Sequence, residues 1–302
     1  GKIVPSLDAG AFYGLSSDYN KGGATYGTFS HVHRFDDGGE LRTTVRRGHY
    51  ERELWATVIG LGTTNGATTT VSNLSDATVI LRRASKGRIA LTNGTAVQSD
   101  YSNKFNWGST RHNLLAGMDF SKDDAKRANS YPDRAGVNRP STTVGTPNDG
   151  ASIADTRLAP IFNEFSARNL GFYAQDTITI TPELKLIAGL RQDQFKAEYE
   201  TATGVKFSRS DRLWSRRFGA LYQPTEWASY HVSYGTSFNT SGDTYQFAVQ
   251  GPSTKDANTP AEKSRNFEIG AKFDLMDQRL SFNPSIFYSE KYNERNTDPD
   301  SA

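Results

Sequence analysis

The stretch "NLGFYAQDTITI" (residues 169–180) alternates with a period of two residues. One set of alternate positions is apolar apart from Asp176, and consists of Leu170, Phe172, Ala174, Ile178 and Ile180. The other set is mostly polar. Such alternation predicts a β-strand with one apolar and one polar face. The fold depends on whether the apolar face packs against a protein core or against lipid.

The same alternation recurs along the chain, as in 114–120, 229–238, 267–275 and 280–289. No helical periodicity extends beyond about two turns, so the sequence predicts an all-β protein. We expect ten strands, near 24–35, 40–57, 91–106, 111–124, 168–181, 184–200, 211–223, 229–240, 263–274 and 279–293. No run of about 18 apolar residues occurs, which excludes a membrane-spanning helix but not a membrane barrel.

The connections between these strands alternate between short and long. Short turns rich in Asp, Gly and Pro are expected at 36–40, 107–111, 181–184, 224–229 and 275–279. Long connections are expected at 58–90, 125–168, 201–211 and 241–263. A soluble sandwich mixes turn lengths and uses crossing connections. Bacterial outer-membrane barrels instead have short periplasmic turns and long extracellular loops, so the layout favours an antiparallel up-and-down transmembrane β-barrel.

Composition narrows the classes of function. The 302 residues carry a formal net charge of +2, which is too balanced to indicate nucleic-acid binding. Cysteine is absent, so disulfides, thiolate metal sites and cysteine nucleophiles are excluded. Aromatic residues make up 12% of the chain, and several, such as Tyr222, Trp227, Tyr230, Phe273 and Tyr288, fall near strand ends where interfacial girdles would lie.

Two blocks of sequence resemble a known family. The segment "ARNLGFYAQDTITITPELKLIAGLRQDQF" (167–195) is similar to the strand–turn–strand pattern G-x-Y-x-Q-D, T-P/D-x-L, L-x-x-G-x-R-x-D of TonB-dependent outer-membrane siderophore receptors. The segment 259–299, which begins "TPAEKSRNFEIGAKFDL", resembles a second hairpin of that family. The phrases "HRFDDGGELRTTVRRGHYER" (33–52) and "NERNTDPDSA" (293–302) most resemble its catecholate-siderophore branch.

The resemblance implies a 22-stranded barrel with an N-terminal plug and a TonB box. Residues 1–302 would then be a partial barrel domain, an incomplete fragment of about ten strands without the plug and without both ends of the barrel. The implied function is energised uptake of ferric catecholate siderophores across the bacterial outer membrane. The implied partners are the TonB–ExbB–ExbD complex, acting through the plug, and outer-membrane lipid and lipopolysaccharide. No cofactor is expected, because iron arrives already wrapped by its chelator.

Catecholate complexes of iron are anionic and aromatic, so cations and aromatic faces are expected where the ligand arrives. The extracellular half supplies candidates near the end of the second expected strand and in the long connections. They are Tyr50, Arg52, Trp55, Arg82, Arg83, Arg127, Tyr131, Arg134, Arg139, Tyr245 and Phe247. The alternative interpretation is that these arginines and aromatic residues are solvated surface residues or contact lipopolysaccharide, since the same residue types suit those roles.

Other motifs in the sequence do not identify a functional site. His31 and His33 share one strand face, but no third metal ligand accompanies them. The pair Arg216–Arg217 straddles two faces of a strand. "GLGTTNG" (60–66) is not a dinucleotide fingerprint, and no βαβ pattern follows it. The motifs G-x-S-x-G and H-E-x-x-H are absent, so we expect no enzyme.

Three alternatives stay open: an outer-membrane barrel enzyme, a receptor of this family for another ligand, and a soluble β-rich binding module. For the opening stretch, we expect the apolar set to contact lipid and the polar set to line the lumen. Asp176 lies on the apolar set, so we expect it near the periplasmic interface, where a carboxylate costs little.

Overall fold

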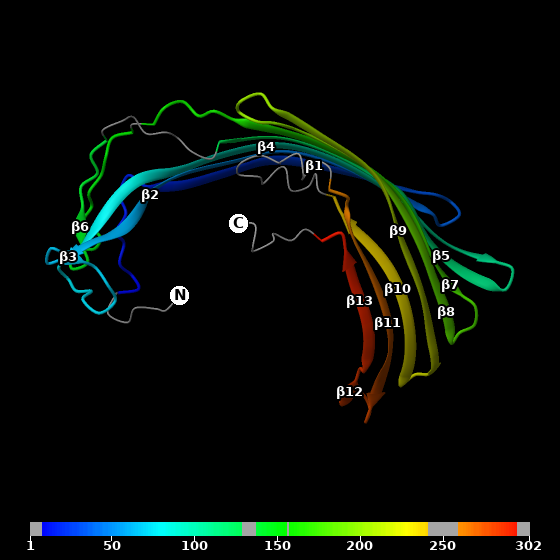
Figure 1. Ribbon diagram of the computed structural model, residues 1–302. Helices are drawn as coiled ribbons and strands as arrows, with labels where there is room; N and C mark the ends of the chain where they lie inside the picture. Colours follow the sequence, from blue (N-terminus) through cyan, green and yellow to red (C-terminus); the bar gives the residue numbers. More distant parts are fainter. Residues whose placement is uncertain (1–7, 129–136, 156, 241–258, 295–302) are drawn as a thin grey trace. The chain divides into compact units, whose positions relative to one another are not determined.

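The computed structural model describes residues 8–128, 137–155, 157–240 and 259–294 (Figure 1). Thirteen strands of this part form one antiparallel sheet. They are β1 (Tyr19–Arg34), β2 (Glu40–Thr64), β3 (Ala67–Thr68), β4 (Thr78–Trp107), β5 (Thr110–Ala128), β6 (Thr142–Thr143), β7 (Asn163–Thr179), β8 (Leu184–Glu200), β9 (Lys206–Thr225), β10 (Ala228–Asn239), β11 (Glu262–Leu275), β12 (Leu280–Phe282) and β13 (Ser285–Tyr292). No helix among these residues is long and apolar enough to cross a membrane.

The strand order is that of an up-and-down sheet. It runs β1-β2-β4-β5-β7-β8-β9-β10-β11-β12, with β13 beside β11 and the two-residue strands β3 and β6 paired with β2 and β4 (Figure 1). The long strands thus pair with their neighbours in sequence. This arrangement confirms the predicted all-β, up-and-down architecture.

The short turns lie where they were predicted, but two of the long connections are much shorter. The predicted loop 58–90 was wrong, because β2 continues to Thr64 and β4 begins at Thr78. Asn65 and Gly66 both adopt positive φ angles, of 51° and 81°, and join Thr64 directly to its partner Ala67. Such a two-residue turn matches the twist of paired strands. Likewise, the connection predicted at 201–211 occupies only the residues between Glu200 and Lys206.

The chain forms two compact units. The first unit comprises residues 1–25, 49–92 and 125–163, and the second comprises 26–48, 93–124 and 164–302. Long strands such as β2 and β4 contribute residues to both units.

In the second unit, the strand register separates an apolar face from a polar face. Phe172 lies opposite Gln192, Ala174 opposite Leu190, and Ile178 opposite Leu186, so the apolar set of β7 continues into β8. The same face continues through β9 to β11 as Ala220, Val232 and Ile269. The other face carries Tyr173 opposite Arg191, and Arg191 opposite Ser215. The predicted alternation of residues 169–180 is therefore present, and Phe172 and Tyr173 lie on opposite faces.

Aromatic side chains mark the short-turn end of the apolar face. Tyr222 stacks on Tyr230, with ring centroids 6.5 Å apart, and Tyr230 contacts Phe273 edge-on at 5.8 Å. Arg265, the next charged residue on the same face, lies ten positions before Leu275, which is at this end of β11. That span is about 33 Å of strand, or roughly 25 Å of height at a 40° tilt. The apolar face therefore has the height of a bilayer's hydrocarbon layer.

Asp176, the exception on the apolar face, pairs with a histidine. Its Oδ2 lies 2.5 Å from Nδ1 of His112, and the His112 Nε2 lies 2.9 Å from the Thr110 hydroxyl. Phe105 stacks on the imidazole with ring centroids 5.1 Å apart. Thr110 is the first residue of β5, after the turn from β4, so the carboxylate lies near the short-turn end, as expected.

Candidate functional site

All the sequence-predicted ligand residues that the structure describes lie in the first unit. These are Tyr50, Arg52, Trp55, Arg82, Arg83, Arg127 and Arg139. Tyr131, Arg134, Tyr245 and Phe247 lie outside the described residues. The seven described residues differ widely in exposure, and the structure gives them different surroundings.

Arg82 lies in β4, not in the loop where it was predicted, and its side chain is completely buried, at 0% exposure. The guanidinium donates to three acceptors from distant parts of the chain. These are the Tyr13 carbonyl at 2.8 Å, the Pro140 carbonyl at 3.1 Å and the Asp149 carboxylate at 2.7 Å. Arg82 therefore ties residues 13 and 140–149 to β4.

The contact with Arg82 changes the pKa of the Asp149 carboxylate. The hydrogen bond from Arg82, followed by one from the Ala151 amide, lowers the pKa of Asp149 to about 2. The carboxylate is therefore ionised at any physiological pH, and the Arg82–Asp149 ion pair persists. This cluster stabilises the fold of the first unit.

A second arginine cluster surrounds Trp55, which is only 3% exposed. The Arg157 guanidinium lies over the Trp55 ring at 4.9 Å and over the Tyr19 ring at 5.5 Å, and it donates to Glu53 at 2.7 Å. Arg157 also pairs with Asp155, whose pKa is lowered to about 2, chiefly by this hydrogen bond. The cluster fixes Asp155 and Arg157 against β1 and β2 through cation–π and charge-assisted contacts.

The other five described candidates are more accessible than Arg82 and Trp55. Arg52 is exposed, and its Nε donates to Asn20 at 3.1 Å. Arg83 is exposed and lies beside Gly60, where a Cβ would approach its Nε to 3.2 Å. Tyr50 is half-buried, as are Arg127 and Arg139. In the described part of the first unit, Arg52 and Arg83 are thus the predicted arginines that present a cationic group to solvent.

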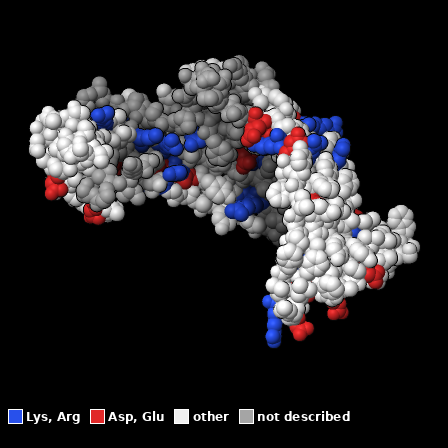
Figure 2. Space-filling model, turned by 60° about the horizontal axis from the view of Figure 1, so that its bottom comes forward, with Lys and Arg blue, Asp and Glu red and all other residues white. Residues whose placement is uncertain are grey.

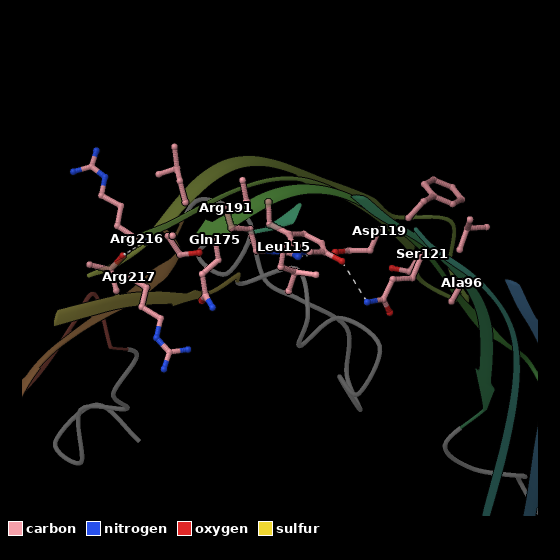
Figure 3. A pocket seen from close by; sticks show the side chains of 17 residues that line it. Ala96, Leu115, Asp119, Ser121, Gln175, Arg191, Arg216 and Arg217 are labelled. Atoms are coloured by element: carbon pink, nitrogen blue, oxygen red, sulfur yellow. Dashed lines mark hydrogen bonds and ion pairs between the residues drawn. The ribbon is translucent and has the colours of Figure 1, made fainter. Parts of the chain in front are cut away.

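The second unit contains a hollow of ≈ 610 Å³, lined by apolar as well as charged side chains, that sequence reasoning did not predict (Figure 3). Arg191 lines this hollow and forms ion pairs with two carboxylates. Its guanidinium forms a two-point ion pair with Asp119, at 2.6 and 3.0 Å, and a second with Asp193, at 2.6 and 2.8 Å. Tyr173 packs against the same guanidinium and donates its hydroxyl proton to Asp100. Arg191 is paired with two carboxylates, so it organises the hollow and offers no free cation there.

Arg217 supplies the accessible cation of this hollow. Arg216 and Arg217 point to opposite sides of the sheet, as their adjacent positions in β9 require (Figure 3). Arg217 shares the polar face with Gln175 and lies opposite Gly189. Its side chain is exposed and forms no ion pair with the described residues, so it can meet an anion on the polar face.

The predicted histidine pair gains no metal-binding partner. His31 and His33 lie in β1, and the His33 ring contacts Phe35 edge-on at 4.6 Å. Within the described ranges, no group of three or more His, Asp or Glu side chains is placed to hold a metal ion.

The sheet, its apolar face and its polar face define an outer-membrane β-barrel. A family model described as TonB dependent receptor-like, beta-barrel matches residues 4–302. The chain therefore belongs to the TonB-dependent receptor β-barrel family and to the bacterial outer membrane. The family consists of receptors and not of enzymes, so the barrel-enzyme and soluble-module alternatives are excluded.

Individual relatives agree with this family. The chain is 24% identical over 316 residues to the catecholate siderophore receptor Fiu of Escherichia coli K12, a match that covers 95% of this chain and 40% of that protein. It is 28% identical over 215 residues to the probable TonB-dependent siderophore receptor PiuA of Acinetobacter baumannii, covering 64% and 29%. The chain thus spans well under half the length of these relatives.

Solved structures show the same fold. The closed form of the ferric-catecholate import receptor Fiu from E. coli K12 superposes with a TM-score of 0.76 at 23% identity, covering 96% of this chain and 44% of that one. At this identity the likeness establishes the fold alone. The apolar face of the second unit can accordingly be assigned to lipid and the polar face to the barrel interior.

Proposed function

We propose that the complete protein takes up ferric siderophores across the outer membrane, and that catecholates are the class it takes. The observation that carries this proposal is the match of 95% of the chain to a receptor named for catecholate siderophores. Because the chain spans 40% of that receptor, transport itself is proposed for the whole protein and not for this part of it.

The chemistry of the first unit supports the choice of ligand class. A ferric catecholate complex is anionic and has aromatic rings. Arg52 and Arg83 present exposed guanidinium groups, which are permanently charged, weakly hydrated and able to stack on aromatic rings. Tyr50, two residues from Arg52, adds a partly exposed aromatic ring. We assign first contact with the ligand to these three side chains, and a supporting role to the buried Arg82 and Trp55.

The partners follow from the same proposal. Iron is cargo, delivered as a chelate, so the barrel supplies no metal ligand. Energy comes from the TonB–ExbB–ExbD complex acting through a plug, and residues 1–302 act as part of the barrel domain around that plug. The apolar face is in contact with outer-membrane lipid and lipopolysaccharide.

Uptake in a defined host tests the proposal. The complete gene product is expressed in an E. coli strain that lacks its own catecholate receptors, and radiolabelled iron is supplied as a ferric catecholate or as a ferric hydroxamate. We expect uptake of the catecholate complex only, and its loss when tonB is deleted. Uptake of the hydroxamate alone would assign another ligand, and uptake that persists without TonB would contradict energised transport.

Variants separate the proposed contact residues from the supporting ones. Replacing Arg52 and Arg83 together by Gln should weaken ferric-catecholate binding roughly tenfold or more, since each cation–anion contact contributes about 1 kcal/mol when partly exposed. The amount of receptor in the outer membrane should stay unchanged. Unaltered binding by this double variant would remove both arginines from the proposed contact surface.

A further inference from the structure

The last part of β10 separates from its neighbour β9. The pairing of these two strands ends at Gly235, opposite Arg217, although β10 stays paired with β11 as far as Asn239. Beyond this point β9 continues to pair with β8. The Arg216 amide, next to the last pair, donates to the Thr236 hydroxyl at 2.9 Å. The two strands therefore diverge toward the end that carries the long connections.

The divergent end of β10 borders a hollow on the polar face of β7 and β8. Phe165 of β7 and Phe195 of β8 lie on this face, which they share with Arg191. Both line a hollow of ≈ 370 Å³, and so do Phe238 and Thr240 from the end of β10. We call this space the phenylalanine hollow. Its volume is within the range of small-molecule sites.

The three phenylalanine rings give the hollow an apolar wall on a face that is elsewhere polar. Phe165 and Phe195 are only 7% and 9% exposed. The faces of aromatic rings carry a partial negative charge, so they attract cations as well as apolar groups. The wall therefore suits a ligand that combines an apolar body with a positive charge.

One carboxylate in the phenylalanine hollow is uncompensated. Asp123 of β5 is half-buried, lines the hollow and forms no hydrogen bond or ion pair with any residue that the structure describes. Asp193 also lines the hollow, but Arg191 pairs with that carboxylate at 2.6 Å. Arg168 borders the hollow too, but it alternates with the polar-face residues of β7, so its side chain lies on the opposite face. Asp123 therefore leaves one negative charge open in the hollow.

Paired carboxylates are present elsewhere in the second unit. Figure 2 shows acidic side chains beside basic ones at the end of a wide uncharged zone on strands of this unit. Asp124, next to Asp123 but on the other face of β5, pairs with Lys122 at 3.0 Å and accepts a hydrogen bond from Ser166 at 2.8 Å. Two adjacent carboxylates of one strand thus differ, since one is compensated and the other is open.

A second polar group in the hollow also lacks a partner. Thr240 is 2% exposed, and its Oγ1 is buried without a hydrogen bond to any group in the described ranges. Buried hydroxyl groups are rarely left unpaired, because they lose their bonds to water without a replacement. The hydroxyl of Thr240 and the carboxylate of Asp123 are therefore two open acceptors in one aromatic-walled space.

We propose that the phenylalanine hollow binds an organic ammonium ion, in which a primary ammonium group is carried on an apolar or aromatic body. The positive charge compensates Asp123, the N–H groups donate to the Asp123 carboxylate and the Thr240 hydroxyl, and the body packs against the phenylalanine rings. A ferric catecholate is an anion, which the same carboxylate repels, so this ligand is separate from the transported one. The inference does not depend on the proposed transport function.

Binding of a fluorinated amine to the complete receptor tests this site. The probe is para-fluorobenzylamine, an ammonium ion at neutral pH, and its fluorine NMR signal is followed as detergent-purified receptor is added. The test variant D123N removes the charge at nearly constant size. Its matched control D124N removes the adjacent carboxylate on the other face. We expect roughly tenfold weaker binding to D123N, since a hydrogen bond to a charged group is lost, and unchanged binding to D124N.

Two further arms identify what is recognised. T240V keeps the shape of the side chain without its hydroxyl, and should weaken binding of the amine roughly fivefold. Neutral para-fluorobenzyl alcohol should bind the unaltered receptor and D123N equally weakly, because it carries no charge. Heat-modifiable migration on gels confirms that each variant is folded, and receptor-free micelles give the background signal.

Three results would overturn the proposal. The first is equal binding of the amine by D123N and the unaltered receptor. The second is an equal loss in D124N, since the amine would then respond to general surface charge and not to the hollow. The third is a lack of binding to the unaltered receptor above the micelle background.

Discussion

Removal of the buried Arg82 guanidinium is expected to release the loop that it holds. In R82A, two backbone carbonyls and the Asp149 carboxylate would lose their donor at a site where the arginine side chain is 0% exposed. The depressed pKa of Asp149, about 2 against an ordinary 3.8, corresponds to about 2 kcal/mol in total, of which the hydrogen bond from Arg82 is the largest part and the Ala151 amide supplies some of the rest. With the orphaned carbonyls added, the expected loss is about 3–5 kcal/mol, which is typical of a broken buried ion pair.

Amide hydrogen exchange measures this loss of stability within the loop that Arg82 holds. The Asn148 amide donates to the Phe12 carbonyl at 2.7 Å, and the Ser16 amide donates to the Ala151 carbonyl at 2.8 Å. If local opening controls exchange, a loss of about 3 kcal/mol speeds the exchange of both amides by roughly a hundredfold. The neighbouring R83A variant removes an exposed arginine and should change exchange by less than about threefold. Unchanged protection in R82A, or an equal effect of R83A, would refute the clamping role of Arg82.

Three further predictions follow from single contacts. Because the folded-state pKa of Asp149 is lowered, its stabilisation is complete above about pH 4 and is lost as the pH falls toward 2. The protection factors of the same loop amides, taken relative to the exchange rate of an unstructured peptide at each pH, should fall over that interval and stay constant between pH 6 and 8. G117A places a Cβ about 2.8 Å from the Tyr173 ring, and should destabilise the polar face by about 1–3 kcal/mol, seen as a lower temperature of heat-modified migration. H112A leaves the Asp176 carboxylate unpaired on the apolar face and should lower the temperature of heat-modified migration. The double variant H112A with D176A should recover most of that loss of stability. No recovery in the double variant would show that the pair is not what stabilises this site.

The strand periodicity and the short turns were sufficient to predict the architecture, because a sheet with one apolar and one polar face requires alternation in every strand. The extents of β2 and β4 were missed. The Asn65–Gly66 dipeptide is a strong two-residue hairpin signal, and the β-branched run that begins at Thr78 favours a strand, but both lay inside a segment interpreted as loop.

The clusters within each unit were harder to predict. Arg157 lies about a hundred residues from Glu53 and Trp55, and no local pattern marks it as their partner. Arg82 and Arg83 are adjacent and identical in type, yet one is buried and the other exposed. Alternation along β4 could have separated them, had that segment been recognised as strand. The histidine partner of Asp176 likewise depends on pairing between strands far apart in sequence.

The assignment of the two sheet faces is tested most directly by accessibility along β7 and β8. Residues 1–302 contain no cysteine, so once any cysteine elsewhere in the complete receptor is replaced, single substitutions can be labelled with a nitroxide. In the complete receptor reconstituted in lipid bilayers, spin labels at F172C and L190C should collide with oxygen, which partitions into lipid. Labels at Y173C and Q175C should collide instead with a water-soluble nickel chelate or be shielded from both. A label at F172C that meets the nickel chelate as readily as one at Y173C would contradict the lipid-facing assignment and, with it, the barrel described here.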